Sequence, residues 1–339
     1  MIIVNLTALS GFLLMGFSDI RELQILHGLL FLAVYLLTLA GNLIIIIITT
    51  VDEHLQAPMY YFLKQLSLLN LSFITVTVPQ SIDNSLMDDG YISQGQCILQ
   101  VFFFKSLAWS EMAILTVMSY DRYAAICFPL HYEVIMNPRT CQRAVIAIWL
   151  NGNISGILFT TTKFSITFCK PKIIHQFFCD IPQLLKLSCS DDYLRVIGVT
   201  TFLPVLGFIG FISIVLSYIQ FFSTVLRIPS TEGRSKAFST CLPHLFVVAF
   251  YVFTGMFAFL KPTSDSPTAF DLMISIFYTV TPPTLNPVIY SLRNEGMKEA
   301  FRKLLLGGQF TRKKKFCALV DTSFLLPVSK ILNNIEFIQ

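Results

Sequence analysis

Ionisable side chains interrupt an otherwise apolar stretch of the chain, residues 97–126. Glu111 lies near its middle, and Asp121 and Arg122 are neighbours near its end. Charged groups within an apolar segment are costly, so they usually have a partner and a function. An adjacent acid and base can form an ion pair, and an arginine released from such a pair offers five donors in a rigid fork. These residues therefore suggest reversible charge pairing and hydrogen bonding.

Motifs of enzymatic catalysis are missing from the sequence. It has no H-E-x-x-H pair, no nucleophile elbow and no phosphate-binding loop. No pair of acids is spaced for chemistry inside a membrane. We therefore predict a protein that is not an enzyme and uses no cofactor.

The elements that position the ionisable groups are predicted membrane spans. Of the 339 residues, 54% are hydrophobic and 13% charged, against about 25% charged in a soluble domain. This composition excludes a soluble enzyme, a disordered protein and a nucleic-acid binder. A span needs roughly 20 mostly apolar residues. Seven segments qualify: 25–49, 58–82, 97–126, 144–162, 196–226, 237–260 and 272–292. The predicted fold is an all-α integral membrane protein, a bundle of seven transmembrane helices.

The distribution of basic residues predicts how the bundle lies in the membrane. Most of the 24 Lys and Arg residues fall on one side if the N-terminus lies outside, which is the favoured orientation. We predict an extracellular tail (residues 1–24), the helical domain (25–306) and a cytoplasmic tail (307–339). Asn5-Leu6-Thr7 is then a glycosylation acceptor in the lumen, although such tripeptides also occur by chance.

The cysteines divide between the two sides of the membrane. Cys97, Cys169, Cys179 and Cys189 fall outside, in an oxidising compartment. Four cysteines suggest two disulfides with three possible connectivities, and free thiols are the alternative.

Helical periodicity places the ionisable groups on one stripe. At about 100° per residue, this stripe holds Phe104, Glu111, Leu115, Met118 and Arg122. A Glu111 that faced lipid would be costly, so the stripe is expected to face the interior of the bundle. Polar partners are available from other spans: Asn42, Asn70 and Asn286. Such a network either holds the helices together or binds a cation and responds to the state of the protein.

Several motifs together resemble the mammalian olfactory receptors. Residues 118–132, MSYDRYAAICFPLHY, resemble the signature of their third helix. Further matches are Gly41-Asn42, PMYYFL at 58–63, Ser217-Tyr218, KAFSTCLPHL at 236–245 and PTLNPVIYSLRN at 283–294. The motifs occur in order over residues 20–305, and the Leu-Pro-His within the sixth span points to the fourteenth subfamily.

The resemblance implies a rhodopsin-like G-protein-coupled receptor of the plasma membrane, in the cilia of olfactory neurons. Its partners would be a small volatile odorant outside and a stimulatory olfactory G protein inside, with cAMP as the output. It implies disulfides from Cys97 to Cys179 and from Cys169 to Cys189. Related receptors have a carboxylate where this chain has Asn70, so the case for a sodium ion near Glu111 is weakened.

The resemblance also assigns residues to the activation switch and to the contact with the G protein. These are Asp121, Arg122, Tyr123, Tyr218, Lys236, His244, Asn286, Pro287 and Tyr290. The simpler interpretations are a charge pair that anchors a helix end and a histidine that only packs. Asn286-Pro287 followed by Tyr290 suggests a hinge with a movable aromatic ring.

A ligand site is expected in the outer half of the bundle, apolar with a few polar groups. Its candidate residues are Phe104, Lys105, Ala108, Trp109, Met112, Phe202, Leu206, Tyr251, Thr254, Gly255, Tyr278 and Thr279. For each aromatic residue alone, ordinary packing is the simpler interpretation. Lys105 either extends to the outer surface or faces the ligand, and in the second case acids or carbonyl compounds are the favoured ligands.

The C-terminal region departs from the olfactory receptor pattern. Residues 295–306 predict an amphipathic helix on the membrane, and some thirty residues follow it. The basic cluster 312–315 could contact anionic lipids and Cys317 could be palmitoylated, or the extension carries no function.

Two rival interpretations of the whole protein remain. One is a transporter or channel, which would need a polar path across the membrane. The other is a decayed receptor marked by Asn70 and the long tail.

Overall fold

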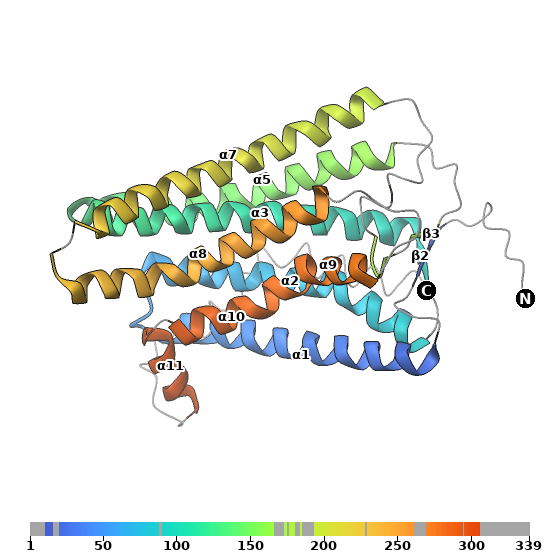
Figure 1. Cartoon of the computed structure of the whole chain (residues 1–339), viewed down its shortest axis with the longest axis horizontal. Coiled ribbons are helices and arrows are strands. Elements are labelled where there is room, and N and C mark those ends of the chain that lie inside the picture. The colour runs from blue at the N-terminus through green and yellow to red at the C-terminus, as the bar shows by residue number, and fades with distance from the viewer. Residues whose placement is uncertain are drawn as a thin grey trace, which may run out of the picture.

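The computed structural model describes residues 11–15, 20–87, 90–165, 173–174, 176–179, 184, 193–227, 229–260, 269–293 and 295–305. Long helices run side by side along one axis (Figure 1). In chain order they are α1 (Arg21–Val51), α2 (Pro58–Met87), α3 (Gln94–Cys127), α5 (Pro138–Phe164), α7 (Tyr193–Val225), α8 (Thr231–Leu260), α9 (Ala269–Thr279) and α10 (Thr281–Arg293). A 3-10 turn, η1 (Pro129–His131), and the short helix α4 (Tyr132–Ile135) connect α3 to α5.

These helices provide the seven spans that the sequence predicts. Among the described residues, α1, α2, α3, α5 and the segment Gly207–Val225 are long and apolar enough to cross a membrane. A shorter apolar segment, Cys241–Phe257, belongs to α8. The seventh span consists of α9 and α10, which meet at Val280. Pro282 and Pro283 follow one residue later, and proline lacks the N–H that would continue a helix. By contrast, α10 continues through Pro287.

Helices α3 and α5 approach each other closely because glycines lie between them. A Cβ atom added at Gly152 would come within 2.6 Å of the Ser106 carbonyl oxygen. A Cβ atom at Gly156 would lie 3.0 Å from the Phe102 carbonyl oxygen and would also clash with Ser106 Oγ. Small residues four positions apart allow two helix backbones to pack tightly within a membrane. This packing brings the outer half of α3 against α5.

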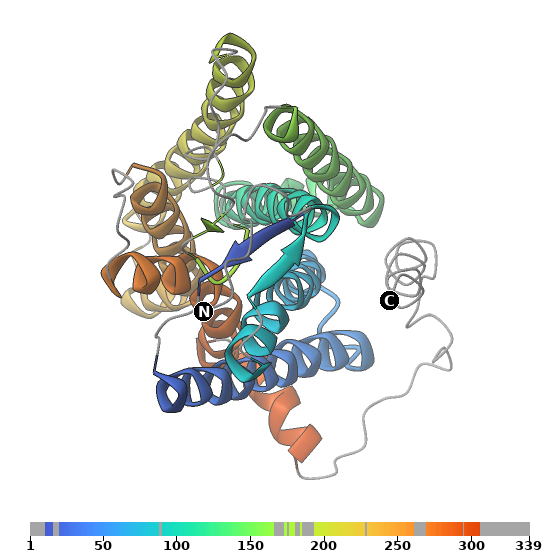
Figure 2. The same cartoon turned by 90° about the vertical axis from the view of Figure 1, so that its right-hand side faces the viewer.

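A small sheet covers the end of the bundle that carries the disulfide, which we call the outer end. Strand β1 (Gly11–Leu14) pairs antiparallel with β2 (Tyr91–Ser93) and parallel with β3 (Ile173–Ile174). Figure 2 shows β1 and β2 lying across the helix ends. Phe12 and Leu14 are buried there with the disulfide. Strand β1 lies within residues 1–24, for which the sequence predicts only a tail, because a four-residue apolar run has no helical or span-length signal.

The helix that follows the seventh span is α11 (Glu295–Leu305). It leaves the direction of the bundle, as Figure 1 shows. Met297 and Ala300 are buried, while Lys303 pairs with Glu299 at 3.2 Å. This division into an apolar and a charged side fits the amphipathic helix expected at residues 295–306. The later tail, including residues 312–315 and Cys317, lies outside the described residues.

Candidate functional site

The predicted stripe of α3 faces the interior of the bundle. Phe104, Glu111, Leu115 and Met118 are all buried, with Glu111 only 2% exposed. The side chain of Arg122, at the cytoplasmic end of the stripe, is 13% exposed. One helix face thus connects an aromatic outer region, a buried acid and a charged inner end.

The buried acid belongs to a chain of hydrogen bonds that joins four helices. Asn286 Nδ2 of α10 donates to Glu111 Oε1 at 3.5 Å and to Asn70 Oδ1 at 3.4 Å. Asn70 Nδ2 of α2 donates in turn to Asn42 Oδ1 of α1 at 3.2 Å. The structure therefore brings together the four side chains that the sequence singles out for a polar network. The sequence names these side chains as possible partners, but only the packing of the four spans determines which of them bond to each other.

Two further contacts extend the network between α1 and α10. Asn42 Nδ2 donates to the Pro283 carbonyl at 3.1 Å, and this carbonyl belongs to α10. The hydroxyls of Thr38 and Thr284 also bond to each other, 2.8 Å apart. Sequence reasoning misses both threonines, because a threonine in a span often bonds only to its own helix.

The side chains of this network do not fit a sodium site. Glu111 is its one carboxylate, and the neighbouring groups that point at its oxygen and at Asn70 Oδ1 are amide N–H donors. Across the described residues, no group of three or more His, Cys, Asp or Glu side chains could hold a metal ion. The arrangement favours a hydrogen-bond network that holds the helices together.

At the inner end of α3, Asp121 forms an ion pair with one residue and a hydrogen bond with another. Arg122 Nη2 lies 3.6 Å from Asp121 Oδ2, and Tyr132 Oη donates to Asp121 Oδ1 at 2.7 Å. Burial, and then the nearby Asp121 carboxylate, raise the pKa of Tyr132, so its hydroxyl stays a proton donor at neutral pH. Tyr132 lies on α4, within the motif that carries the resemblance, but the sequence alone assigns it no role.

Other predicted switch residues meet between α7, α8 and α10. Tyr218 Oη of α7 lies 2.5 Å from His244 Nδ1 of α8, and the two rings stack. Tyr290 is buried, and its hydroxyl has no hydrogen-bond partner among the described residues. Tyr123 instead packs edge-on against Phe128, near the surface. The side chain of Lys236 lies outside the described part of the chain.

In the outer half, some of the predicted ligand residues form an aromatic group. The rings of Phe104 on α3 and Tyr278 on α9 lie 6.2 Å apart, and Phe178 stacks on Phe104 at 5.5 Å. Phe178 precedes Cys179 in an outer loop, and sequence reasoning missed it because loop residues have no periodicity to follow. Tyr251 of α8 joins the same helix face by donating its hydroxyl to the Ala108 carbonyl at 2.8 Å.

The remaining ligand candidates are more dispersed. The ring of Trp109 faces Gly207 of α7, and the Thr254 hydroxyl bonds to the Phe250 carbonyl of its own helix. Thr279 is fully buried and also bonds within its helix, to Ser275. Met112 and Gly255 are partly buried. The side chains of Phe202 and Leu206 lie outside the part of the chain that the structure describes.

Lys105 is directed toward α5. It is 7% exposed, and its Nζ lies 4.8 Å from the centroid of the Phe159 ring of α5 and 5.8 Å from that of Phe104. Burial at this level does not match a side chain that extends to the outer surface. The ammonium group therefore lies beside α5, whereas the Phe104 ring faces Phe178 and Tyr278.

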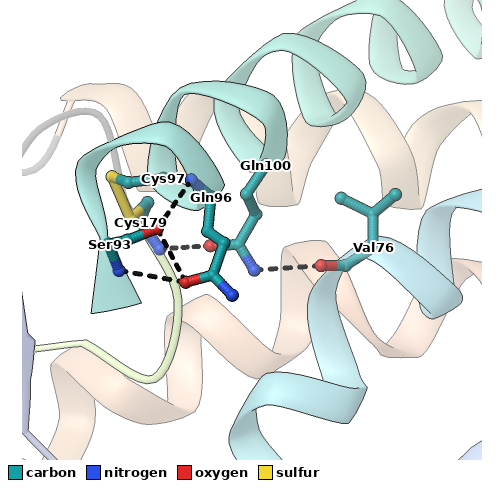
Figure 3. Close-up of a disulfide and its surroundings, with 6 residues drawn as sticks. All are labelled: Val76, Ser93, Gln96, Cys97, Gln100 and Cys179. Carbon is teal, nitrogen blue, oxygen red and sulfur yellow. Dashed lines mark hydrogen bonds between the residues drawn. A yellow bond between two sulfur atoms is a disulfide. The ribbon is translucent and has the colours of Figure 1, made fainter. Parts of the chain in front are cut away.

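The outer loop is attached to α3 by a disulfide and a hydrogen-bonded glutamine (Figure 3). Cys97 bonds to Cys179, the pairing that the resemblance implies. Gln100, one turn further along α3, accepts from the Cys179 amide at 2.8 Å and donates to the Val76 carbonyl of α2 at 2.9 Å. Ser93 and Gln96 cap the start of α3 reciprocally. Cys169, Cys189 and Asn5 lie outside the described residues.

Comparison with known proteins decides the family. A family model described as olfactory receptor matches residues 31–307. The chain belongs to the olfactory receptor family. This receptor is 64% identical over 311 residues to human olfactory receptor 14J1, covering 92% of this chain and 97% of that protein. It is 52% identical over 309 residues to human olfactory receptor 14A16, covering 91% and 99% of the two chains. These relatives place the receptor in family 14, as predicted.

The fold agrees with that assignment. The receptor superimposes on the crystal structure of squid rhodopsin with a TM-score of 0.66 at 18% identity, covering 86% of this chain and 89% of that one. The predicted rhodopsin-like bundle is thereby confirmed. The receptor is a multi-pass membrane protein of a receptor family and not an enzyme, and the family assignment removes the transporter or channel interpretation.

Proposed function

We propose that this olfactory receptor binds small volatile organic molecules in the outer half of the bundle and activates a stimulatory olfactory G protein at its inner face. The result is a rise in cAMP. The observation that carries the proposal is the buried stripe of α3, on which an aromatic outer group, the Glu111 network and the Asp121–Arg122 pair follow one another.

The outer part of the proposal rests on which helices meet there. Three aromatic residues meet there. Phe104 belongs to α3, while Tyr251 of α8 and Tyr278 of α9 both contact α3. A ligand among these side chains would touch three helices at once. Such a ligand changes the balance of two packings only to the extent that it binds one of them better.

The inner part rests on the paired state of Arg122. In this structure its guanidinium lies beside Asp121, while Tyr132 holds the same carboxylate. An arginine released from that pair would present its donors to the carbonyl oxygens at the end of a partner helix. Lys236 at the start of α8 and Pro287 with Tyr290 in α10 would take part in that change.

The test is cAMP output in cells that express the receptor with the stimulatory olfactory G protein, challenged with a panel of short acids, aldehydes and alcohols. We expect a dose-dependent rise for at least one class, lost in Arg122→Ala at equal surface staining. A response that survives Arg122→Ala would contradict the coupling role. Full surface expression without a response to any class would favour a decayed receptor.

A further inference from the structure

A short segment of the outer loop lies in the interior of the bundle. Residues 176–179, which we call the outer plug, are all buried, and Phe177 and Phe178 within it are 2% and 1% exposed. Both rings belong to the same apolar cluster as Phe73 of α2 and Phe104 of α3. Loops ordinarily run over the surface, because buried backbone needs polar partners. A loop segment that is buried among helices therefore calls for an explanation.

The outer plug connects three helices through its aromatic rings. The centroid of the Phe177 ring lies 5.6 Å from that of Phe31 on α1. The centroid of the Phe178 ring lies 5.5 Å from that of Phe104 on α3 and 6.3 Å from that of Tyr278 on α9. Phe104 and Tyr278 are both candidate ligand residues. Phe178 thus occupies a place that the proposed function gives to the ligand.

Gln100 of α3 holds the backbone of the outer plug next to Phe178 (Figure 3). Its Oε1 accepts from the Cys179 amide at 2.8 Å, and its Nε2 donates to the Val76 carbonyl of α2 at 2.9 Å. The disulfide to Cys97 fixes the sulfur atom of Cys179, whereas Gln100 fixes its amide. One buried side chain therefore connects the outer plug to both α2 and α3.

The buried position of the outer plug also carries a cost. Gln176 is buried, and its Oε1 has no hydrogen-bond partner among the described residues. A buried acceptor without a partner is destabilising, and water would satisfy it if the segment moved outward. The aromatic contacts and the Gln100 bonds offset this cost. Opposing contributions of this kind are expected of an element that has two alternative positions.

We propose that the outer plug is an autoinhibitory contact, and that an odorant activates the receptor by displacing Phe178 from Phe104 and Tyr278. This inference rests on the proposed function and names how its ligand site is regulated. The plug is in place while Arg122 is paired with Asp121, the arrangement that is silent in the proposed mechanism. Because the displaced ring vacates the space that the ligand takes, no preformed cavity is needed. The ligand shifts the balance to the extent that it binds the displaced state better.

The test is ligand-independent cAMP production, normalised to surface staining, in cells that express the full-length receptor with the stimulatory olfactory G protein. We expect Phe178→Ala to raise it severalfold, because the aromatic contacts that favour the silent packing are lost. Phe159→Ala is the matched control, since Phe159 is a buried phenylalanine of α5 whose apolar cluster contains neither Phe104 nor Phe178. The control should lower Tm and leave basal cAMP unchanged.

Variants of Gln100 test the outer plug without removing an aromatic ring. Gln100→Met can neither accept from the Cys179 amide nor donate to the Val76 carbonyl, so it should also raise basal cAMP. Hydrogen exchange at residues 176–179 of the purified receptor should become faster in this variant. Gln100→Glu retains an oxygen that accepts from the Cys179 amide, and it should return both the exchange and the basal cAMP toward the wild-type level.

The outcomes separate this inference from the proposed function. Wild-type basal cAMP in Phe178→Ala and Gln100→Met, in a receptor that responds to the panel of short acids, aldehydes and alcohols, would overturn the inference and leave the proposed function standing. An equal rise in Phe159→Ala would also overturn it, because any loss of packing would then be enough.

Two further outcomes bear on the proposed function. Raised basal cAMP in the plug variants, without a response of the wild type to any odorant, would support the autoinhibitory contact and contradict activation by odorants. If neither odorants nor variants raise cAMP, the proposed coupling fails. Hydrogen exchange then decides the inference: faster exchange in Gln100→Met supports it, and unchanged exchange overturns it.

Discussion

Tyr132 is the residue that connects the inner loop to the charge pair of α3. Its hydroxyl donates to Asp121 at 2.7 Å, on the carboxylate that also pairs with Arg122. A hydrogen bond to a charged group contributes roughly 1.5–3 kcal/mol. The bond stabilises the arrangement in which Arg122 is paired, and in the proposed mechanism this arrangement is the silent state of the receptor.

We therefore predict that Tyr132→Phe raises ligand-independent cAMP production severalfold per receptor at the surface. The loss of even part of the bond energy is enough for such a shift in population. The measurement is basal cAMP, normalised to surface staining. Tyr120→Phe is the control, because Tyr120 is 45% exposed and its change should leave the basal level as it is. A basal level in Tyr132→Phe that equals the wild type would show that this bond does not restrain the pair.

Single residues also show how far sequence reasoning reaches. The burial of Glu111 follows from periodicity, because one helix face repeats at about 100° per residue whatever its neighbours are. The direction of Lys105 does not follow in this way. Its ammonium group lies beside Phe159, and only the packing of α3 on α5 determines that contact.

At the level of elements, the close contact of α3 and α5 depends on Gly152. The Cβ atom of any side chain there would clash with the Ser106 carbonyl of α3. Because this carbonyl belongs to the backbone, it cannot move away by changing rotamer as a flexible side chain can. The contact sets the spacing of these two helices. It also supports the helix on which the stripe lies.

We predict that Gly152→Val separates α3 from α5 and lowers both Tm and surface expression, because an overpacked contact typically costs about 1–3 kcal/mol. Flow cytometry of the N-terminally tagged receptor and thermal unfolding would measure the two effects. Gly95→Ala is the matched control, since an added Cβ atom there meets nothing within 4 Å. Unchanged Tm and expression in Gly152→Val would mean that the helices can separate at no cost.

For the whole molecule, orientation in the membrane places the sheet and the disulfide outside. The same orientation exposes Asn5 to glycosylation, whereas the other two acceptor tripeptides, at Asn70 and Asn153, lie within α2 and α5. A buried or membrane-embedded asparagine is out of reach of the modifying enzyme, and Asn70 is 1% exposed. Among the three acceptor asparagines, we therefore expect only Asn5 to be glycosylated.

We predict that treatment with a glycosidase increases the gel mobility of the wild-type receptor and does not change that of Asn5→Gln. Thr7→Ala removes the same tripeptide while keeping the asparagine and should behave like Asn5→Gln. A glycosidase shift that persists in both variants would contradict the predicted use of Asn5. Absence of any shift in the wild type would argue against glycosylation in an external N-terminal tail.

The sequence by itself determined the number of spans, their approximate limits, the interior face of α3 and the family. These properties are local, because hydrophobic length and helical periodicity act within one segment and a motif is a run of neighbours. Only the tertiary structure decided that Asn42, Asn70, Asn286 and Glu111 meet and that β1 closes the outer end. Contacts between distant segments depend on how helices pack, and packing is set by shape complementarity across elements that no single segment encodes.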